Sequence, residues 1–98
     1  MLKPTELAAD FDERRKAIGF WMRDGDNRLV RIFVMCDGLW RLDPSQVRDL
    51  ATAFKQFYAQ RSHFERVVSD RHTRHQPYDG EYEGQPMMIL RDNDIAPP

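Results

Sequence analysis

Histidines and nearby carboxylates are the residues in this chain whose types and spacing could bind a metal ion. His72 and His75 are three positions apart, so a helix would place both imidazoles on one face, and His63 lies nine residues before His72. The segment that follows offers three carboxylates: Asp79, Glu81 and Glu83. Imidazoles near a helix end also interact favourably with the helix dipole without any metal. We therefore predict no metal site and no cofactor, and keep a metal-dependent enzyme using His72 and His75 as an alternative.

The residues that could act as nucleophiles lack suitable neighbours. Cys36 is the single cysteine, which excludes an intramolecular disulfide and an all-cysteine zinc site and fits a reducing compartment. Asp37 beside it disfavours the thiolate, so a structural role is the better interpretation. No Ser, His and Asp arrangement has informative spacing, and the glycines form no phosphate-binding loop. We expect no catalytic residues and no enzymatic activity.

A charged pair interrupts an apolar stripe, and this is the least ordinary feature of the chain. At about 100° per residue, seven apolar residues fall within one stripe of a helix: Val47, Leu50, Phe54, Phe57, Tyr58, Phe64 and Val68. Arg61 lies near the midline of the stripe and Glu65 nearer its edge, at the i,i+4 spacing of a helical ion pair. The interaction candidates are this pair and three apolar neighbours: Arg61, Glu65, Phe57, Phe64 and Val68.

The helical segment that carries the stripe, residues 43–75, is too long for its domain. It starts with Asp43, which can cap a helix, and Pro44, which suits the first helical position, and no Pro or Gly follows before Pro77. A straight helix from Pro44 to His75 would be about 48 Å long. A globule of this chain length is only roughly 33 Å across. One uninterrupted helix would therefore extend beyond its own domain.

Three arrangements resolve this mismatch. The helix could break near Gln60 to Ser62, which would let Arg61 face water. It could instead project, so that the stripe meets a second copy of the chain and Arg61 and Glu65 fix the register. In the third arrangement the pair faces a ligand or another partner.

The strongest local prediction is an antiparallel β-hairpin over residues 17–36. Two segments, 17–22 and 29–36, alternate between apolar and other residues, as strands with one buried face do. Asp24, Gly25 and Asn27 lie between them and can take the positive φ that hairpin turns require.

The remaining segments complete a single domain over residues 1–98. We expect a polar lead-in at 1–16, a turn or one helical turn near Leu39 to Leu42, an acidic loop at 76–85 and a strand at 86–91. Pro86 has no N–H to donate, so this strand should start there or lie at an edge. The predicted fold class is α+β: an antiparallel β-hairpin plus a C-terminal strand packed against one long or broken amphipathic helical segment.

Charge is distributed unevenly although the totals nearly cancel. The 98 residues are 41% hydrophobic and 32% charged, with a formal net charge of -1, so no global field attracts nucleic acid or membrane. Residues 55–75 hold five Lys and Arg against two acids, a local net of +3, and residues 76–98 hold five acids against Arg91, a net of -4. Arg48, Lys55 and Arg66 share one flank of the predicted helix and could touch phosphates. A weak nucleic-acid-binding accessory protein is the alternative function.

The chain shows no sign of export or of a membrane span. Residues 1–15 are rich in charge and leave no apolar core for a signal peptide. No run approaches the roughly 18 apolar residues of a spanning helix. We expect a cytoplasmic protein that does not contact a membrane.

The following residues occur in order along the chain: Asp12, Arg15, Ile18, Phe20, Val30, Ile32, Val34, Ala53, Phe54, Arg61, Glu65, Ile89, Asp94 and Ile95. In this order the chain, from about Phe11 to Ile95, resembles a group of short bacterial proteins catalogued only as a domain of unknown function. The His- and Arg-rich segment 71–85 departs from that pattern. The resemblance implies an α+β fold and a bacterial origin, and it supplies no catalytic residue.

These observations favour a small non-enzymatic protein-interaction domain of unknown biological role. The overlong helix and its interrupted stripe predict self-association as a homodimer through the helical face. The identity of any other protein partner is open.

Overall fold

The β-hairpin forms the centre of the structure, as its alternating pattern predicts. This computed structural model describes residues 2–45 and 47–95. Strands β3 (Ala17–Arg23) and β4 (Leu29–Met35) pair antiparallel, with Ile18 opposite Val34 and Met22 opposite Val30. Cys36, predicted as the end of the second strand, instead begins a short helix, α1 (Cys36–Arg41).

The turn of this hairpin is organised by one buried carboxylate. Asp24 Oδ1 accepts hydrogen bonds of 2.9 Å from the backbone N–H groups of both Asp26 and Arg28. Asn27 takes a φ of 65°, a left-handed conformation that Asn tolerates better than most residues.

The rest of the sheet is added on both sides of the hairpin. Within the described ranges it has six strands in the order β1, β3, β4, β6, β5, with β2 also paired to β3. Strand β6 (Gln85–Leu90) runs parallel to β4, and β5 (Gly80–Tyr82) runs antiparallel to β6. These pairings confirm the predicted α+β class, in which the last strand joins the hairpin sheet.

Two predicted loops contain strands. The lead-in supplies β1 (Lys3–Pro4) and β2 (Asp10–Asp12), both antiparallel to β3. The acidic loop supplies β5, so β6 is an inner strand, and Pro86 is its second residue rather than a mark of the sheet edge. β1 and β2 pair with the hairpin strand β3, and β5 pairs with β6; the short polar sequences do not reveal these tertiary pairings.

The predicted helical segment breaks near Gln60, which is one of the three arrangements that the mismatch between helix length and domain size left open. Helix α2 (Leu50–Ala59) ends at Gln60, whose φ of -116° and ψ of 14° are not helical, and α3 (Arg61–Thr73) follows at once. The structure therefore contains two helices joined by an elbow at Gln60, and the longest dimension of the molecule is 41 Å. A last short helix, α4 (Asp92–Ile95), follows β6.

The predicted helix start at residues 43–46 is wrong. Gln46 lies outside the described residues, and α2 begins at Leu50, where Asp49 Oδ1 accepts a hydrogen bond of 2.7 Å from Thr52 N. The Asp43 carboxylate accepts instead from Ser45 and from Gln56 Nε2, so it binds the loop to α2. Two aspartates could have served as the cap, and the one with a free carboxylate does so.

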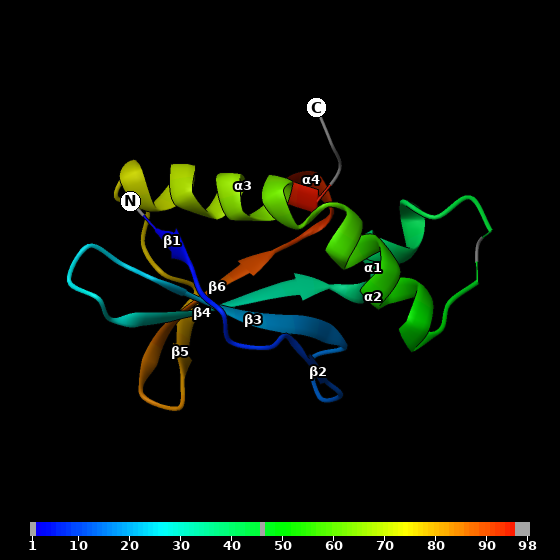
Figure 1. Ribbon diagram of the computed structural model, residues 1–98, viewed down its shortest axis with the longest axis horizontal. Coiled ribbons are helices and arrows are strands. Elements are labelled where there is room, and N and C mark those ends of the chain that lie inside the picture. The colour runs from blue at the N-terminus through cyan, green and yellow to red at the C-terminus, as the bar shows by residue number, and fades with distance from the viewer. Residues whose placement is uncertain (1, 46, 96–98) are drawn as a thin grey trace.

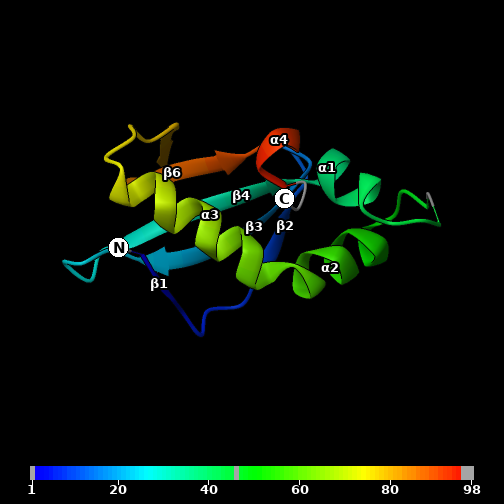
Figure 2. The same cartoon turned by 90° about the horizontal axis from the view of Figure 1, so that it is seen from above.

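Helices α2 and α3 cover one face of the sheet (Figures 1 and 2). The core between the layers includes Phe20 from β3, whose ring centroid lies 5.3 Å from that of Phe57 in α2. The rings of Phe57 and Phe64 stack across the elbow at 6.0 Å. No helix in the described ranges is both long and apolar enough to cross a bilayer.

Candidate functional site

The outward side of α2 and the loop before it carries a row of exposed apolar side chains. Val47, Leu50 and Tyr58 are 47%, 45% and 54% exposed, and the ring of the partly buried Phe54 stacks on that of Tyr58 at 6.1 Å. We call Val47, Leu50, Phe54 and Tyr58 the α2 surface. These residues belong to the stripe that the sequence predicted; Val47, Leu50 and Tyr58 are its exposed part, and Phe54 also packs against the core.

A hollow of about 450 Å³ adjoins the α2 surface. It is lined by residues of α1 and the following loop: Trp40, Arg41, Asp43, Pro44 and Arg48. The Trp40 indole donates a hydrogen bond of 2.9 Å to Asp49 O, which holds α1 against the start of α2. The molecule thus presents protruding apolar side chains and a concave site side by side.

The other half of the stripe forms the core. Phe57, Phe64 and Val68 are 0% exposed because the elbow at Gln60 turns α3 back across the sheet. Their predicted role as interaction residues does not fit this burial, since a partner could not touch them without opening the core. Burial against the chain's own sheet satisfies the same apolar surface that a second copy would have covered.

The Arg61 and Glu65 pair lies at the elbow between these two halves. Arg61 Nε lies 3.5 Å from Glu65 Oε2, and the two side chains are 24% and 18% exposed. The guanidinium carbon of Arg61 lies 5.4 Å from the ring centroid of Phe20 and 5.7 Å from that of Phe57. The pair therefore covers the end of the core and faces water along one side only.

The basic residues proposed for nucleic acid do not share one helix. Arg48 lies in the loop before α2, Lys55 on α2 and Arg66 on α3, beyond the elbow. Lys55 Nζ lies 4.0 Å from the Asp43 carboxylate, which offsets part of its charge. The predicted common flank is therefore interrupted, and nucleic-acid binding stays a prediction.

The histidines and acidic residues do not assemble into a metal-binding group. Among the described residues, no three His, Cys, Asp or Glu side chains come together in that way. His72 lies beside Tyr78, with ring centroids 6.2 Å apart, and both line a small cavity with His75. Burial lowers the pKa of His72, which favours its neutral form.

Cys36 is fully buried at the start of α1. Burial, together with the charge of Asp37, raises the pKa of its thiol to about 11. The thiolate that a nucleophile or a metal ligand requires is therefore strongly disfavoured, in agreement with a structural role.

Sequence reasoning missed the most buried charge in the described chain. Arg31, on β4, is 1% exposed and lies on the face of the sheet away from α2 and α3. Its guanidinium carbon lies 4.9 Å from the ring centroids of Trp21 and Phe33 and 4.8 Å from that of Tyr82. Nη2 donates to Asp10 Oδ1 at 2.5 Å. The rings also face Nε and Nη1, which have no hydrogen-bond acceptor among the described residues.

Neighbouring residues are arranged around this arginine. A side chain at Gly19 would collide with the guanidinium, so glycine leaves it room over β3. A second arginine contacts the same rings: the guanidinium carbon of Arg15 lies 4.8 Å from the Phe33 ring centroid and 5.5 Å from that of Tyr82. Figure 1 shows β2 and β5, which carry Asp10 and Tyr82, on this side of the sheet. One signal in the sequence could have revealed this burial. Trp21, Arg31 and Phe33 fall on the hairpin face that was expected to be solvated, where two large aromatic rings are unusual.

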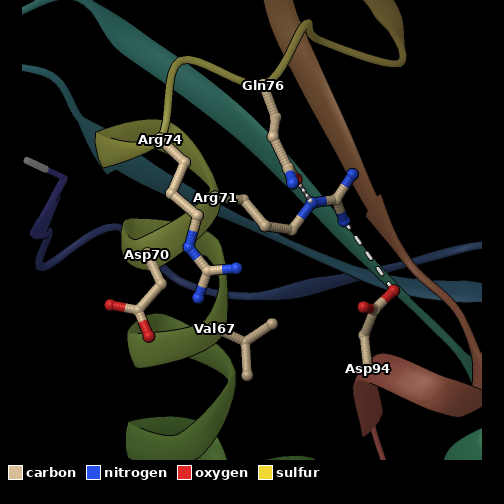
Figure 3. Close-up of a pocket in the computed structure, with 6 residues that line it drawn as sticks. All are labelled: Val67, Asp70, Arg71, Arg74, Gln76 and Asp94. Atoms are coloured by element: carbon tan, nitrogen blue, oxygen red, sulfur yellow. Dashed lines mark hydrogen bonds and ion pairs between the residues drawn. The ribbon is translucent and has the colours of Figure 1, made fainter.

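A polar cavity of about 440 Å³ lies beside α3 (Figure 3). Val67, Asp70 and Arg71 from α3 line it, together with Arg74 directly after the helix, Gln76 and Asp94. Arg71 crosses the cavity, where Nε lies 3.3 Å from Gln76 Oε1 and Nη1 lies 3.7 Å from Asp94 Oδ2. Because acceptors surround its guanidinium, Arg71 is not free to bind an external anion.

Comparison with known proteins shows the fold. No family model matches the chain, and no curated protein matches it. A crystal structure of a protein of unknown function from the DUF1488 family of Shewanella loihica PV-4 is similar, with a TM-score of 0.67 at 15% sequence identity. The match covers 89% of this chain and 90% of that one. This neighbour, like the family that the sequence resembles, has no known function, so the comparison supports the α+β fold and leaves the function open.

Proposed function

We propose that this protein is a small non-enzymatic interaction domain that associates with a second copy of itself through the α2 surface. The observation that carries the proposal is the exposure of Val47, Leu50 and Tyr58 in one row beside the half-buried Phe54. Single exposed apolar residues are ordinary, whereas contiguous rows of large ones are typical of association surfaces.

A second copy is the partner that the local shape favours. In a two-fold contact each copy offers the same patch, so a protruding group and a hollow on one chain can serve both halves. The hollow of about 450 Å³ beside Trp40 and Pro44 is lined also by Arg48, the residue after Val47, and a side chain such as Tyr58 from the second copy would occupy it. The hollow and the α2 surface together provide a larger contact area than the α2 surface alone. A stable interface needs about 800 Å² per partner.

Charge around this surface is compatible with a two-fold contact. Arg41 pairs with Asp92, and Lys55 lies near Asp43, so much of the positive charge near the hollow is already offset within one chain. Like charges that meet across the axis would then repel less than isolated ones. Aromatic residues and arginines such as Tyr58 and Arg48 are also common in interface cores.

Light scattering on the purified protein at micromolar concentration tests the proposal. The wild-type chain, with a monomer mass of 11.6 kDa, should show twice that mass. The double variant Leu50→Gln/Tyr58→Gln should be a monomer with an unchanged circular dichroism spectrum, because both side chains are outside the core. A wild-type protein that stays strictly monomeric would sink the proposal.

Leu7→Gln is the matched control for this surface. Leu7 is 43% exposed, close to the 45% of Leu50, and it lies between β1 and β2, away from α2. The control should keep the wild-type mass. If it dissociates as readily as the double variant, the contact is not at the α2 surface.

A further inference from the structure

The outer edge of β6 continues past the end of β5. Along the described chain, backbone pairing on this side ends where Asp79 N donates to Met87 O at 2.9 Å. Every second residue of a strand points its N–H and C=O to the same edge, so those of Ile89 follow Met87 on this side, and Arg91 lies just past the end of β6. Such an unpaired edge would be a template for another strand.

Three side chains occupy that edge in place of a strand. The Ile89 N–H donates to Asp79 Oδ2 at 2.7 Å, and the Ile89 C=O accepts from Arg71 Nη1 at 3.0 Å. The Arg91 N–H then donates to Asp94 Oδ2 at 3.2 Å. The acceptor and the donor that meet Ile89 are the groups that the backbone of a neighbouring strand would offer, and Asp94 engages the first backbone N–H past β6.

These three side chains are joined to one another. Arg71 Nη2 lies 3.4 Å from Asp79 Oδ2, and Arg71 Nη1 lies 3.7 Å from Asp94 Oδ2. Figure 3 shows Arg71 extending from α3 across the cavity toward Asp94 on α4. The arginine is only 19% exposed, so the chain of charges is partly shielded from water. We call Asp79, Arg71 and Asp94 the edge cap.

We propose that the edge cap keeps the sheet closed: it takes the place of a further strand and thereby prevents the β6 edge from pairing with the β6 edge of a second copy. Pairing of one β6 edge with another would be a second two-fold contact, and two different two-fold contacts on one chain link copies into larger assemblies. This device is separate from the α2 surface, and it holds whether or not that surface forms a dimer.

The test compares edge-cap variants with neighbours that line the same cavity. Arg71→Met removes the donor to the Ile89 C=O, and Asp79→Ala removes the acceptor of the Ile89 N–H. We therefore expect both variants to form oligomers larger than those of the wild type. Their infrared spectra should show intermolecular β-structure. The controls Arg74→Met and Asp70→Asn change two residues that line the same cavity, neither of which bonds to β6 in the described structure. They should behave like the wild type.

Hydrogen exchange gives a local readout of the same cap. In Asp79→Ala the amide of Ile89 should exchange roughly tenfold faster, as expected for loss of a charge-assisted hydrogen bond. Amides of β3, on the far side of β4, should keep their protection. Unchanged exchange at Ile89 would overturn the assignment of Asp79 as its acceptor.

A rescue variant separates edge pairing from simple unfolding. Lysine on an edge strand opposes pairing between sheets, so Ile89→Lys added to Arg71→Met should restore the wild-type size. Oligomers that persist in this double variant, or controls that aggregate as much as Arg71→Met, would overturn the proposal. Carrying Leu50→Gln/Tyr58→Gln in the same background should reduce the oligomers to dimers paired through β6, which distinguishes this edge from the α2 surface.

Discussion

The two faces of the central sheet bury their side chains by different means. On the face under α2 and α3 the core residues are apolar, and Phe20 packs on Phe57 without any charged group at its centre. On the opposite face the guanidinium of Arg31 is equally buried, between aromatic rings and one exposed carboxylate. A sheet that lacks a second helical layer can therefore cover itself with arginine and aromatic side chains, whose stems and rings supply apolar area.

This difference predicts which substitutions on each face should lower the free energy of unfolding most. The helix-covered face depends on the volume of its side chains, because closely packed cores lose both transfer energy and cavity energy on truncation. The stability of the other face depends on a hydrogen-bond acceptor for the buried guanidinium of Arg31. Four experiments test this contrast, starting with the largest expected effect.

Phe57→Ala should be the most destabilising single change. Phe57 is 0% exposed and touches Phe20 and Phe64, so its removal leaves a cavity that costs about 3–5 kcal/mol of unfolding free energy. Urea unfolding measures the loss. Tyr58→Ala, the next residue and 54% exposed, should cost about 0.5 kcal/mol as a control on isolated monomers. Equal losses for the two variants would contradict the assigned core.

Asp10→Ala should cost more than Arg31→Met on the opposite face. Without Asp10 the buried guanidinium loses its carboxylate acceptor, a cost of about 2 kcal/mol. Arg31→Met removes the charge itself and leaves an apolar chain among the same rings, so the expected change is within about 1 kcal/mol. Urea unfolding measures both losses. If Arg31→Met lowers the free energy of unfolding more than Asp10→Ala does, Arg31 stabilises the protein more through its charge than through the volume of its side chain.

The pH dependence of stability should be detectable at Asp43, on the helix-covered side. Hydrogen bonds from the Ser45 hydroxyl and the Gln56 amide lower the pKa of its carboxyl to about 2 from an ordinary 3.8. The unfolded chain takes up a proton at higher pH than the folded one, so this contribution is complete above about pH 4 and is lost as pH falls toward 2. Asp43→Asn should unfold with a shallower acid dependence than the wild type, and an unchanged slope would contradict the assignment.

Arg61→Met should have the smallest effect of the four. Its ion pair with Glu65 is partly exposed, and such i,i+4 pairs contribute about 0.3–0.5 kcal/mol. The methionine keeps contact with Phe20 and Phe57, so thermal unfolding should shift little. A loss as large as that of Asp10→Ala would mean that the two arginines do not differ as their burial suggests.

Local patterns were enough for several parts of the fold and the candidate site. The alternation over residues 17–36 predicted the hairpin, and the mismatch between helix length and domain size allowed the break that occurs at Gln60. The apolar stripe also contained the residues of the α2 surface. The helix start was misplaced because the Asp43 carboxylate accepts hydrogen bonds from Ser45 and Gln56 and does not cap a helix, whereas Asp49 caps α2.

The sequence by itself determined the α+β class and the hairpin, because these follow from periodicity and turn residues that act over a few positions. Tertiary structure decided which half of the stripe is core and which half is exposed, because the elbow angle depends on contacts between α3 and the sheet. It also decided that Arg31 is buried and that Asp79, Arg71 and Asp94 meet at the β6 edge. These residues come from separate elements, and only folding brings their charges close enough to act together.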